Sequence, residues 1–259
     1  LIGPRDGSPV LLMHGILMDS MLNRDLASAL ADAGYRVALL DLLGHGRSEK
    51  PDRAEELRID AFGDQAVSSI SNFVAVAITA NVATAGQFGQ FSLGYAGLLL
   101  FLGAQRALIG ETLLVKYSAA GSLTDSVRKG VLGASVLAAA VTVPLLLAGA
   151  VLADQSARLI WFVIAASLPF VLLQDTLRYL FICEHRPWRA LLIDAVWAAL
   201  SITSMAAVAA TSGAVWAVVL CWGGGAAAAL VLGLLLARVL PSVRDGRRWL
   251  GVNRNPGLR

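Results

Sequence analysis

The chain has 259 residues, of which 57% are hydrophobic and only 15% are charged, and its formal net charge is +3. Soluble domains carry roughly 25% charged residues, so this composition indicates a large surface in contact with lipid. The 21 Lys and Arg residues lie at the ends of apolar stretches without aromatic residues between them, which argues against nucleic acid as a partner. Cys183 and Cys221 lie in or beside apolar segments and predict no disulfide scaffold.

The first 63 residues predict a strand, a helix and a second strand. Residues 9–13 and 35–40 are short apolar runs typical of buried strands, and apolar residues recur between them at helical spacing. This order is typical of a parallel α/β sheet. Two strands and one helix leave the sheet edges open, so we predict a truncated α/β segment at residues 1–63.

This segment contains the runs VLLMHG at residues 10–15 and AGYRVALLDLLGHGRSEKP at 33–51. The amino-acid sequence of these runs resembles the N-terminal part of α/β-hydrolases of the lipase and esterase type. The resemblance implies that His14 and Gly15 are the remnant of an oxyanion-hole turn, and that residues 44–48 shape the edge of the site. The serine elbow of such enzymes, G-x-S-x-G, does not occur; the nearest pentapeptide, residues 90–94, lacks its first glycine. None of the three histidines matches a catalytic position, so we predict no catalytic residue and no enzyme.

Six apolar stretches near the length of a bilayer-spanning helix follow. We therefore predict an all-α integral membrane fold, a six-transmembrane-helix bundle over residues 64–240 followed by a basic cytoplasmic tail at 241–259. Small residues from Gly223 to Ala229 predict close helix packing. The predicted spans are residues 67–83, 88–105, 131–153, 159–182, 190–210 and 215–236.

The distribution of cationic residues predicts the topology. With six spans, 20 of the 21 Lys and Arg residues fall on one side of the membrane, and Arg158 alone falls on the other. Cationic loops stay in the cytoplasm, so we predict a multi-pass plasma-membrane protein with both termini cytoplasmic. The chain starts with Leu1 rather than Met, so we expect a fragment whose first span acts as an uncleaved anchor.

Residues 64–118, beginning DQAVSSISNFVAVAITANVATAGQFGQFSLGYAG, resemble the start of polysaccharide exporters of the multidrug/oligosaccharidyl-lipid/polysaccharide flippase superfamily. This resemblance extends to residue 259 by helix spacing and implies the first lobe of a two-lobed transporter. It implies a lipid-linked oligosaccharide as cargo, carried only if a second lobe or a homodimer completes the path.

Polar residues within the apolar stretches are the candidate site. Asn72, Arg106 and Glu111 are the predicted cargo-contacting residues. In the alternative interpretation Arg106 and Arg178 extend to the interface, and Asp175 pairs with Arg178 on one helix face. Further polar residues at membrane depth are Gln174 and Asp194. Residues 183–185 offer too few ligands for zinc, so no metal or cofactor is predicted.

Three functions remain open. The first is half of an oligosaccharide flippase, the second a membrane-tethered α/β-hydrolase, and the third an inactive chimera of the two. Residues 62–67 join the two segments without a Gly/Ser or Pro-rich linker, which indicates a fusion at a short shared sequence. The bilayer is the expected partner in all three.

Overall fold

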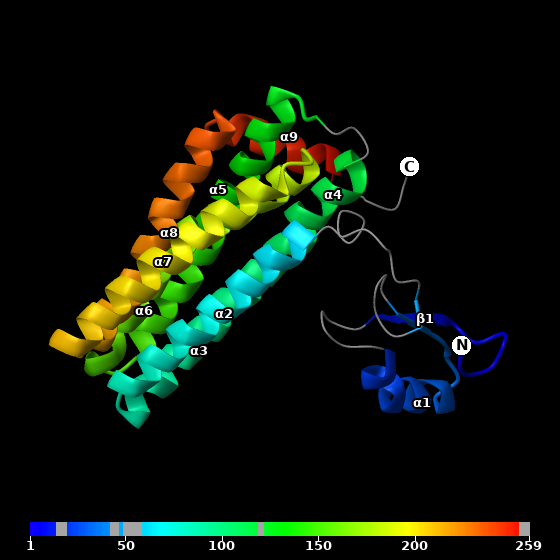
Figure 1. The fold of residues 1–259 in the computed structure, drawn as a ribbon, viewed down its shortest axis with the longest axis horizontal. Helices are drawn as coiled ribbons and strands as arrows, with labels where there is room; N and C mark the ends of the chain where they lie inside the picture. The colour runs from blue at the N-terminus through cyan, green and yellow to red at the C-terminus, as the bar shows by residue number, and fades with distance from the viewer. Residues whose placement is uncertain (14–19, 42–46, 49–58, 119–121, 254–259) are drawn as a thin grey trace. The chain divides into compact units, whose positions relative to one another are not determined.

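The computed structural model describes residues 1–13, 20–41, 47–48, 59–118 and 122–253. The chain divides into two compact units, Leu1–Phe62 and Gly63–Arg259 (Figure 1). The first unit holds a small sheet and a helix, and the second is a bundle of long helices. His14, Gly15 and residues 44–46 of the predicted hydrolase site lie outside the described residues.

The N-terminal unit is a parallel strand–helix–strand arrangement, as predicted. Strand β1 (Pro9–Met13) pairs in parallel with β2 (Arg36–Leu40), with Pro9 opposite Arg36 and Met13 opposite Leu40. The short 3₁₀ helix η1 (Ser20–Asn23) and helix α1 (Arg24–Asp32) form the crossover. Its Ala27 and the strand residue Val37 are fully buried, whereas Leu11, Leu26 and Leu40 are exposed. Among the described residues of this unit, the core is therefore small and apolar surface is left uncovered.

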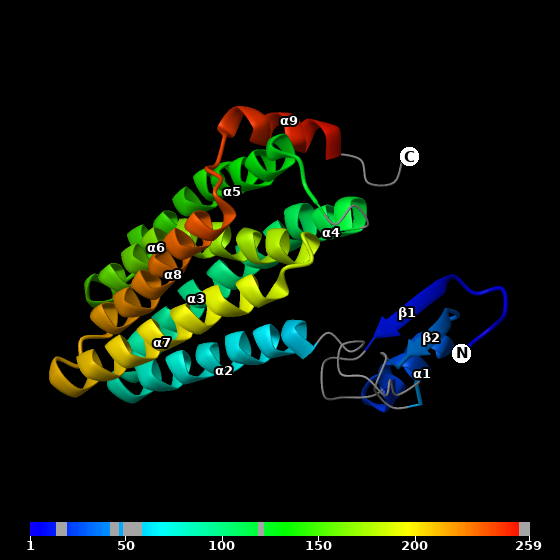
Figure 2. The ribbon, with the colours of Figure 1, turned by 45° about the horizontal axis from the view of Figure 1, so that its top comes forward.

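The second unit places long helices side by side, as Figures 1 and 2 show. Helix α6 is central and packs closely against α3, α5, α7 and α8, and α7 pairs with α8. Thr84 caps α3 in a reciprocal arrangement with Gln87, and Thr124 caps α5 by accepting from the Val127 N–H. The helices are α2 (Ile59–Val82), α3 (Ala85–Gln105), α5 (Asp125–Leu152), α6 (Gln155–Cys183), α7 (Pro187–Thr211) and α8 (Val215–Ala237).

Five helices of the described chain have the length and apolar composition needed to cross a bilayer. They correspond to the second to sixth predicted spans. The first predicted span lies in α2, whose apolar part, Val67–Val82, is shorter than the others. Length and composition thus agree with a membrane location for five of the six predicted spans.

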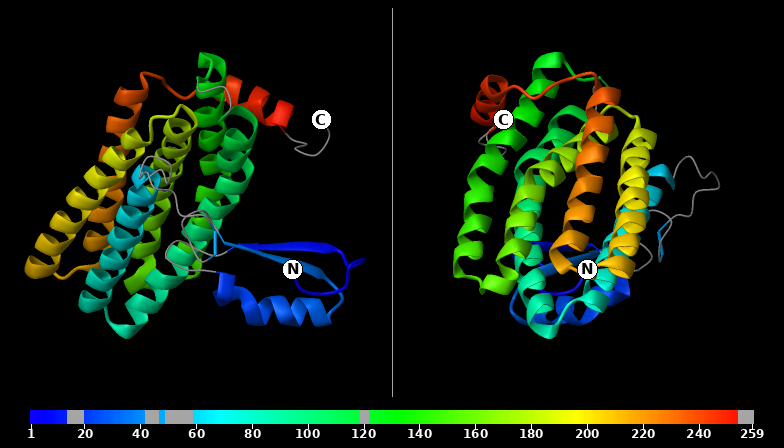
Figure 3. Two further views of the ribbon diagram at one scale, coloured as in Figure 1. Left: turned by 45° about the vertical axis from the view of Figure 1, so that its right-hand side comes forward. Right: turned by 90° about the vertical axis from the view of Figure 1, so that its left-hand side faces the viewer.

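Two features of the bundle depart from the predicted elements. Helix α3 does not end at residue 105 but continues through a π-helical turn, η3 (Arg106–Gly110), into α4 (Glu111–Tyr117), so the combined helix has 33 residues. The predicted basic tail contains an additional helix, α9 (Val243–Asn253), which crosses one end of the bundle beside α5 (Figure 3).

Two glycines of α5 allow α9 to approach closely. A Cβ atom on Gly130 would lie 3.0 Å from the Cβ of Trp249, and one on Gly133 would meet the Ser242 carbonyl. The ammonium group of Lys116 donates to the Asn253 Oδ1 at 3.0 Å, which ties the end of α9 to α4. Helix α9 is therefore a packed part of the bundle.

We expect Gly133→Ala to destabilise the protein, because its methyl group would displace the segment at Ser242. The overpacking should lower the free energy of unfolding by about 2 kcal/mol, measured by denaturation in detergent micelles. Gly224→Ala is the control, since its Cβ meets nothing within 4 Å. Alanine is the better helix former, so this control should be neutral or stabilising. Equal behaviour of the two variants would contradict the close contact.

Candidate functional site

The hydrolase-like unit gathers backbone donors around one carboxylate, that of Asp41. Asp41 follows β2 directly, and its Oδ1 accepts from the Ser20 N–H at 2.6 Å while its Oδ2 accepts from the Arg47 N–H at 3.0 Å. The Ser48 hydroxyl donates to the Asp41 carbonyl. Asp41 therefore fixes the segments near the carboxyl ends of both parallel strands, where open α/β sheets bind their ligands.

Asp41 was not among the predicted site residues, although its position directly after a predicted strand was a usable signal. Of the predicted hydrolase residues, the structure describes Arg47 and Ser48, and both contact Asp41. The predicted oxyanion-hole remnant, His14 and Gly15, lies in the part of the chain that the structure does not describe. The role assigned to that remnant stays a prediction.

A charged network lies inside the helical bundle, centred on Asp175 of α6. The Arg106 guanidinium approaches this carboxylate as a fork, with Nε 3.0 Å from Oδ2 and Nη2 2.6 Å from Oδ1. Arg178 Nη1 also donates to Oδ1 at 3.0 Å, which confirms the predicted Asp175–Arg178 pair. Only 2% of the Asp175 side chain is exposed. Two cations therefore compensate one buried carboxylate from two sides.

The network continues into α7. Arg178 Nε lies 3.1 Å from Asp194 Oδ2, and Gln174 Nε2 donates to Asp194 Oδ1 at 2.5 Å. Both Asp194 and Gln174 are buried. The two arginines and two aspartates balance in charge, which is the condition under which ionised groups persist in an apolar interior. Burial of Arg178 rules out the alternative in which it extends to the interface.

Neutral side chains extend the network toward α5. Gln105 Nε2 donates to the Leu172 carbonyl at 2.8 Å and lies 3.1 Å from Thr176 Oγ1. The hydroxyls of Thr176 and Ser135 are 2.6 Å apart. Hydrogen bonds and ion pairs thus connect α3, α5, α6 and α7 around a single polar centre.

Of the predicted cargo-contacting residues, only Arg106 belongs to this network. Its side chain is 35% exposed, so the network reaches the surface at this position. Arg106 starts the π-helical turn η3, a feature that frequently marks functional sites. Asn72 is half-buried on α2, and Glu111 is exposed at the start of α4. The Glu111 backbone N–H donates to the Arg106 carbonyl across η3, whereas the Arg106 side chain is directed to Asp175.

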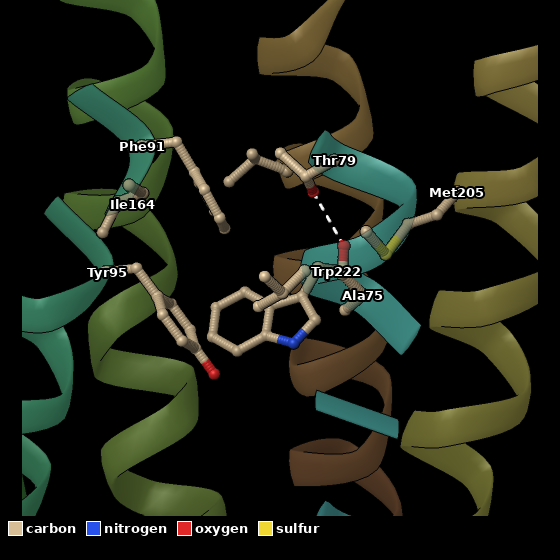
Figure 4. A pocket seen from close by; sticks show the side chains of 9 residues that line it. Ala75, Thr79, Phe91, Tyr95, Ile164, Met205 and Trp222 are labelled. Atoms are coloured by element: carbon tan, nitrogen blue, oxygen red, sulfur yellow. Dashed lines mark hydrogen bonds between the residues drawn. The ribbon is translucent and has the colours of Figure 1, made fainter. Parts of the chain in front are cut away.

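A second feature is a small apolar cavity between the helices (Figure 4). Phe91 and Tyr95 of α3 stack with ring centroids 5.5 Å apart, and Tyr95 meets the edge of Trp222 at 5.8 Å. Thr79 of α2 contributes to the lining, but its hydroxyl is bonded to the Ala75 carbonyl at 2.8 Å. The cavity volume is about 10 Å³, the space of a single water. A sugar does not fit this cavity.

Residues 8–79 match the family model described as the alpha/beta hydrolase fold. A haloalkane dehalogenase of Mycolicibacterium paratuberculosis is 46% identical over 66 residues, which cover 26% of this chain and 22% of that protein. A haloalkane dehalogenase of Mycobacterium marinum is 51% identical over 51 residues, covering 20% and 17%. That of Psychrobacter cryohalolentis is 51% identical over 49 residues, covering 19% and 16%. The chain thus spans about a fifth of the length of these relatives, and no solved structure matches.

The matches bear out the predicted likeness of the N-terminal segment to α/β-hydrolases. They extend it to residue 79, beyond the predicted end at residue 63 and into α2. The comparisons give no support to the predicted likeness of residues 64–259 to a flippase.

The prediction that the chain is not an enzyme is contradicted by its similarity to haloalkane dehalogenases, which are enzymes. That prediction relied on the missing G-x-S-x-G pentapeptide and on the lack of a histidine at a catalytic position. The pattern tests for a serine nucleophile only, whereas carboxylates also serve as nucleophiles in covalent catalysis. The missing serine elbow therefore did not justify the conclusion.

We expect Asp175→Asn to lower the free energy of unfolding by about 3 kcal/mol, because Arg106 and Arg178 would lose their shared counter-charge. Titration of the micelle-bound protein with a denaturing detergent would measure this change. The control Asp154→Asn removes an exposed carboxylate that makes no side-chain cap and should be near neutral. In the double variant Arg106→Gln with Asp175→Asn, the total loss should be smaller than the sum of the single losses. Additive losses would disprove the coupling.

Proposed function

We propose that this chain is a membrane-anchored protein of the α/β-hydrolase type, in which residues 8–79 supply the start of the catalytic sheet and the apolar helices form the anchor. The family match to this segment carries the proposal. The parallel pairing of β1 with β2 through the crossover helix α1 supports it, because this is the unit from which such sheets are built.

The names of the relatives indicate the substrate class, a haloalkane from which halide is released. Such chemistry needs an activated nucleophile and donors that stabilise the departing anion. We assign His14 and Gly15 to the donor turn and Asp41 to positioning, through its bonds to Ser20 and Arg47. The proposal assigns no nucleophile within the matched segment, which amounts to about a fifth of the relatives' length.

The anchor is proposed to lie in the plasma membrane with both termini in the cytoplasm. Five helices of suitable length and composition support the membrane location. The orientation depends on α2, whose apolar stretch Val67–Val82 is the shortest. If α2 crosses the bilayer, the number of spans is even and the termini share one side. The concentration of Lys and Arg on one side under six spans favours this arrangement.

Membranes from cells producing the full chain should release bromide from bromobutane faster than membranes from cells without it. Asp41→Asn should lower the rate at least tenfold, because a neutral amide cannot accept two N–H groups as strongly as a carboxylate. The control Asp32→Asn changes an exposed carboxylate at the end of α1 and should keep the rate. Release no faster than in empty membranes would overturn the enzymatic proposal.

A second candidate is transport of a lipid-linked oligosaccharide, and the buried charges inside the apolar helices favour it. Ionised residues at membrane depth are costly and commonly mark substrate or ion pathways. Arg106 is the partly exposed cation of this network and the proposed contact for an anionic cargo. In this candidate Asn72 and Glu111 line the route, and a second copy of the chain supplies the missing lobe.

The transport candidate requires self-association, because a single copy provides one lobe only. Crosslinking of intact membranes with a short amine-reactive or cysteine-reactive reagent should then give a dimer at low expression levels. Detection of monomer alone, under conditions that crosslink a known membrane dimer, would exclude a homodimeric transporter. The hydrolase proposal is unaffected by this result.

A further inference from the structure

The corner at which α8 ends carries an open apolar hollow with one cation on its rim. Helix α8 ends at Ala237, and Arg238 follows in a left-handed conformation with φ of 51°, its N–H donating to the Leu234 carbonyl at 2.8 Å. The hollow beside this turn has a volume of about 380 Å³. Its lining residues are Val231, Leu234, Leu235, Arg238, Val239 and Leu240.

The Arg238 side chain is not needed to satisfy the last carbonyl groups of α8, because other arginine side chains donate to them. Arg189 Nη1 donates to the Leu236 carbonyl at 3.0 Å, and Arg128 donates to that of Ala237. Arg128 also pairs with Glu184 at 3.0 Å. Arg238 is exposed, and none of the carboxylates in the described residues forms an ion pair with it. Its positive charge is therefore available to a ligand.

The following helix adds cations on its outer face. Helix α9 buries Gly246, Trp249 and Asn253 against the bundle. At 3.6 residues per turn, the three arginines of α9 fall on the opposite side, and all three are exposed. Between residues 238 and 253 there are four arginines and one acidic residue, Asp245, so the corner carries a net charge of +3 (4 − 1). The arginines are Arg238, Arg244, Arg247 and Arg248.

We propose that this corner is a binding site for an anionic phospholipid. One acyl chain lies in the hollow along the exposed Leu235, and the phosphate pairs with Arg238. The arginines of α9 lie over the neighbouring headgroups, and the exposed Leu240 reaches toward the acyl region. A helix with cations on one face and apolar residues beside them is typical of the membrane interface. A free phosphate ion would make no favourable contact with the apolar walls of the hollow.

This inference rests on the proposed membrane location, because the end of α8 must lie at headgroup depth. Helix α8 is one of the five bilayer-length helices, and the chain turns directly after it into α9. The exposed fractions of Leu235 and Leu240 are 69% and 70%, and a lipid chain would shield this apolar surface from water.

Native mass spectrometry of the full chain in detergent should test the site, with equal amounts of phosphatidylglycerol and phosphatidylcholine of the same acyl chains. Phosphatidylglycerol should be retained in preference. Arg238→Asn should lower this preference about fivefold, the effect expected for one interfacial cation. Asparagine tolerates the left-handed conformation, so the turn is kept. The control Arg158→Asn removes an exposed arginine outside the corner and should leave the preference unchanged.

Leu235→Trp should fill the hollow and lower the retention of both lipids. No preference for phosphatidylglycerol, or the same loss in Arg158→Asn, would overturn the site. Displacement of the lipid by excess inorganic phosphate would also overturn it, since the ligand would then be the phosphate group alone. Alkaline extraction of membranes distinguishes failure of the membrane location from failure of the lipid site. A chain released by this wash disproves the membrane location, and a retained chain without lipid preference disproves this site only.

Discussion

Asp175 receives two guanidinium groups, and the arrangement of the bundle depends on this carboxylate. Arg106 reaches it from the end of α3, and Arg178 approaches it from the next turn of α6. Arg178 also pairs with Asp194 of α7, so one continuous set of charges joins three helices. An unpaired charge at this depth would cost several kcal/mol. The helices therefore have a preferred rotation and depth relative to each other that apolar packing alone would not impose.

The close approach of α8 to α6 and α7 depends on small residues. A Cβ on Gly225 would lie 2.9 Å from Trp197 Cδ1, and one on Gly233 would lie 2.7 Å from a Leu177 methyl carbon. A Cβ on Gly110, which lies beside the charged network, would lie 2.9 Å from ring atoms of Tyr179. In the proposed membrane location, apolar side chains that face lipid are already in an apolar solvent, so van der Waals contact at these small residues is a main source of helix association. The polar network then selects among the packings that the small residues permit.

The sequence allowed the helices of the bundle to be located because five of the apolar runs are long enough for a bilayer-spanning helix. It also allowed the pairing of Asp175 with Arg178 to be predicted, because side chains three residues apart on a helix lie on the same face. The contact of Arg106 with Asp175 joins residues 69 positions apart and depends on the tertiary packing of α3 against α6. Helix α9 was missed because the density of arginines indicated a solvated tail. Its buried positions, Gly246, Trp249 and Asn253, do recur at helical spacing.

Helix α2 illustrates why the two segments are difficult to separate by sequence. The hydrolase match ends at residue 79, whereas the apolar stretch of the same helix begins at Val67. Residues 67–79 therefore belong both to the segment that matches the hydrolase fold and to the apolar stretch of α2. A helix packed on a sheet and a helix beside lipid both select apolar residues, and the serines of this stretch suit neither setting fully. This overlap accounts for the difficulty of placing a boundary between the two segments, and the proposed orientation of the chain depends on whether α2 crosses the bilayer.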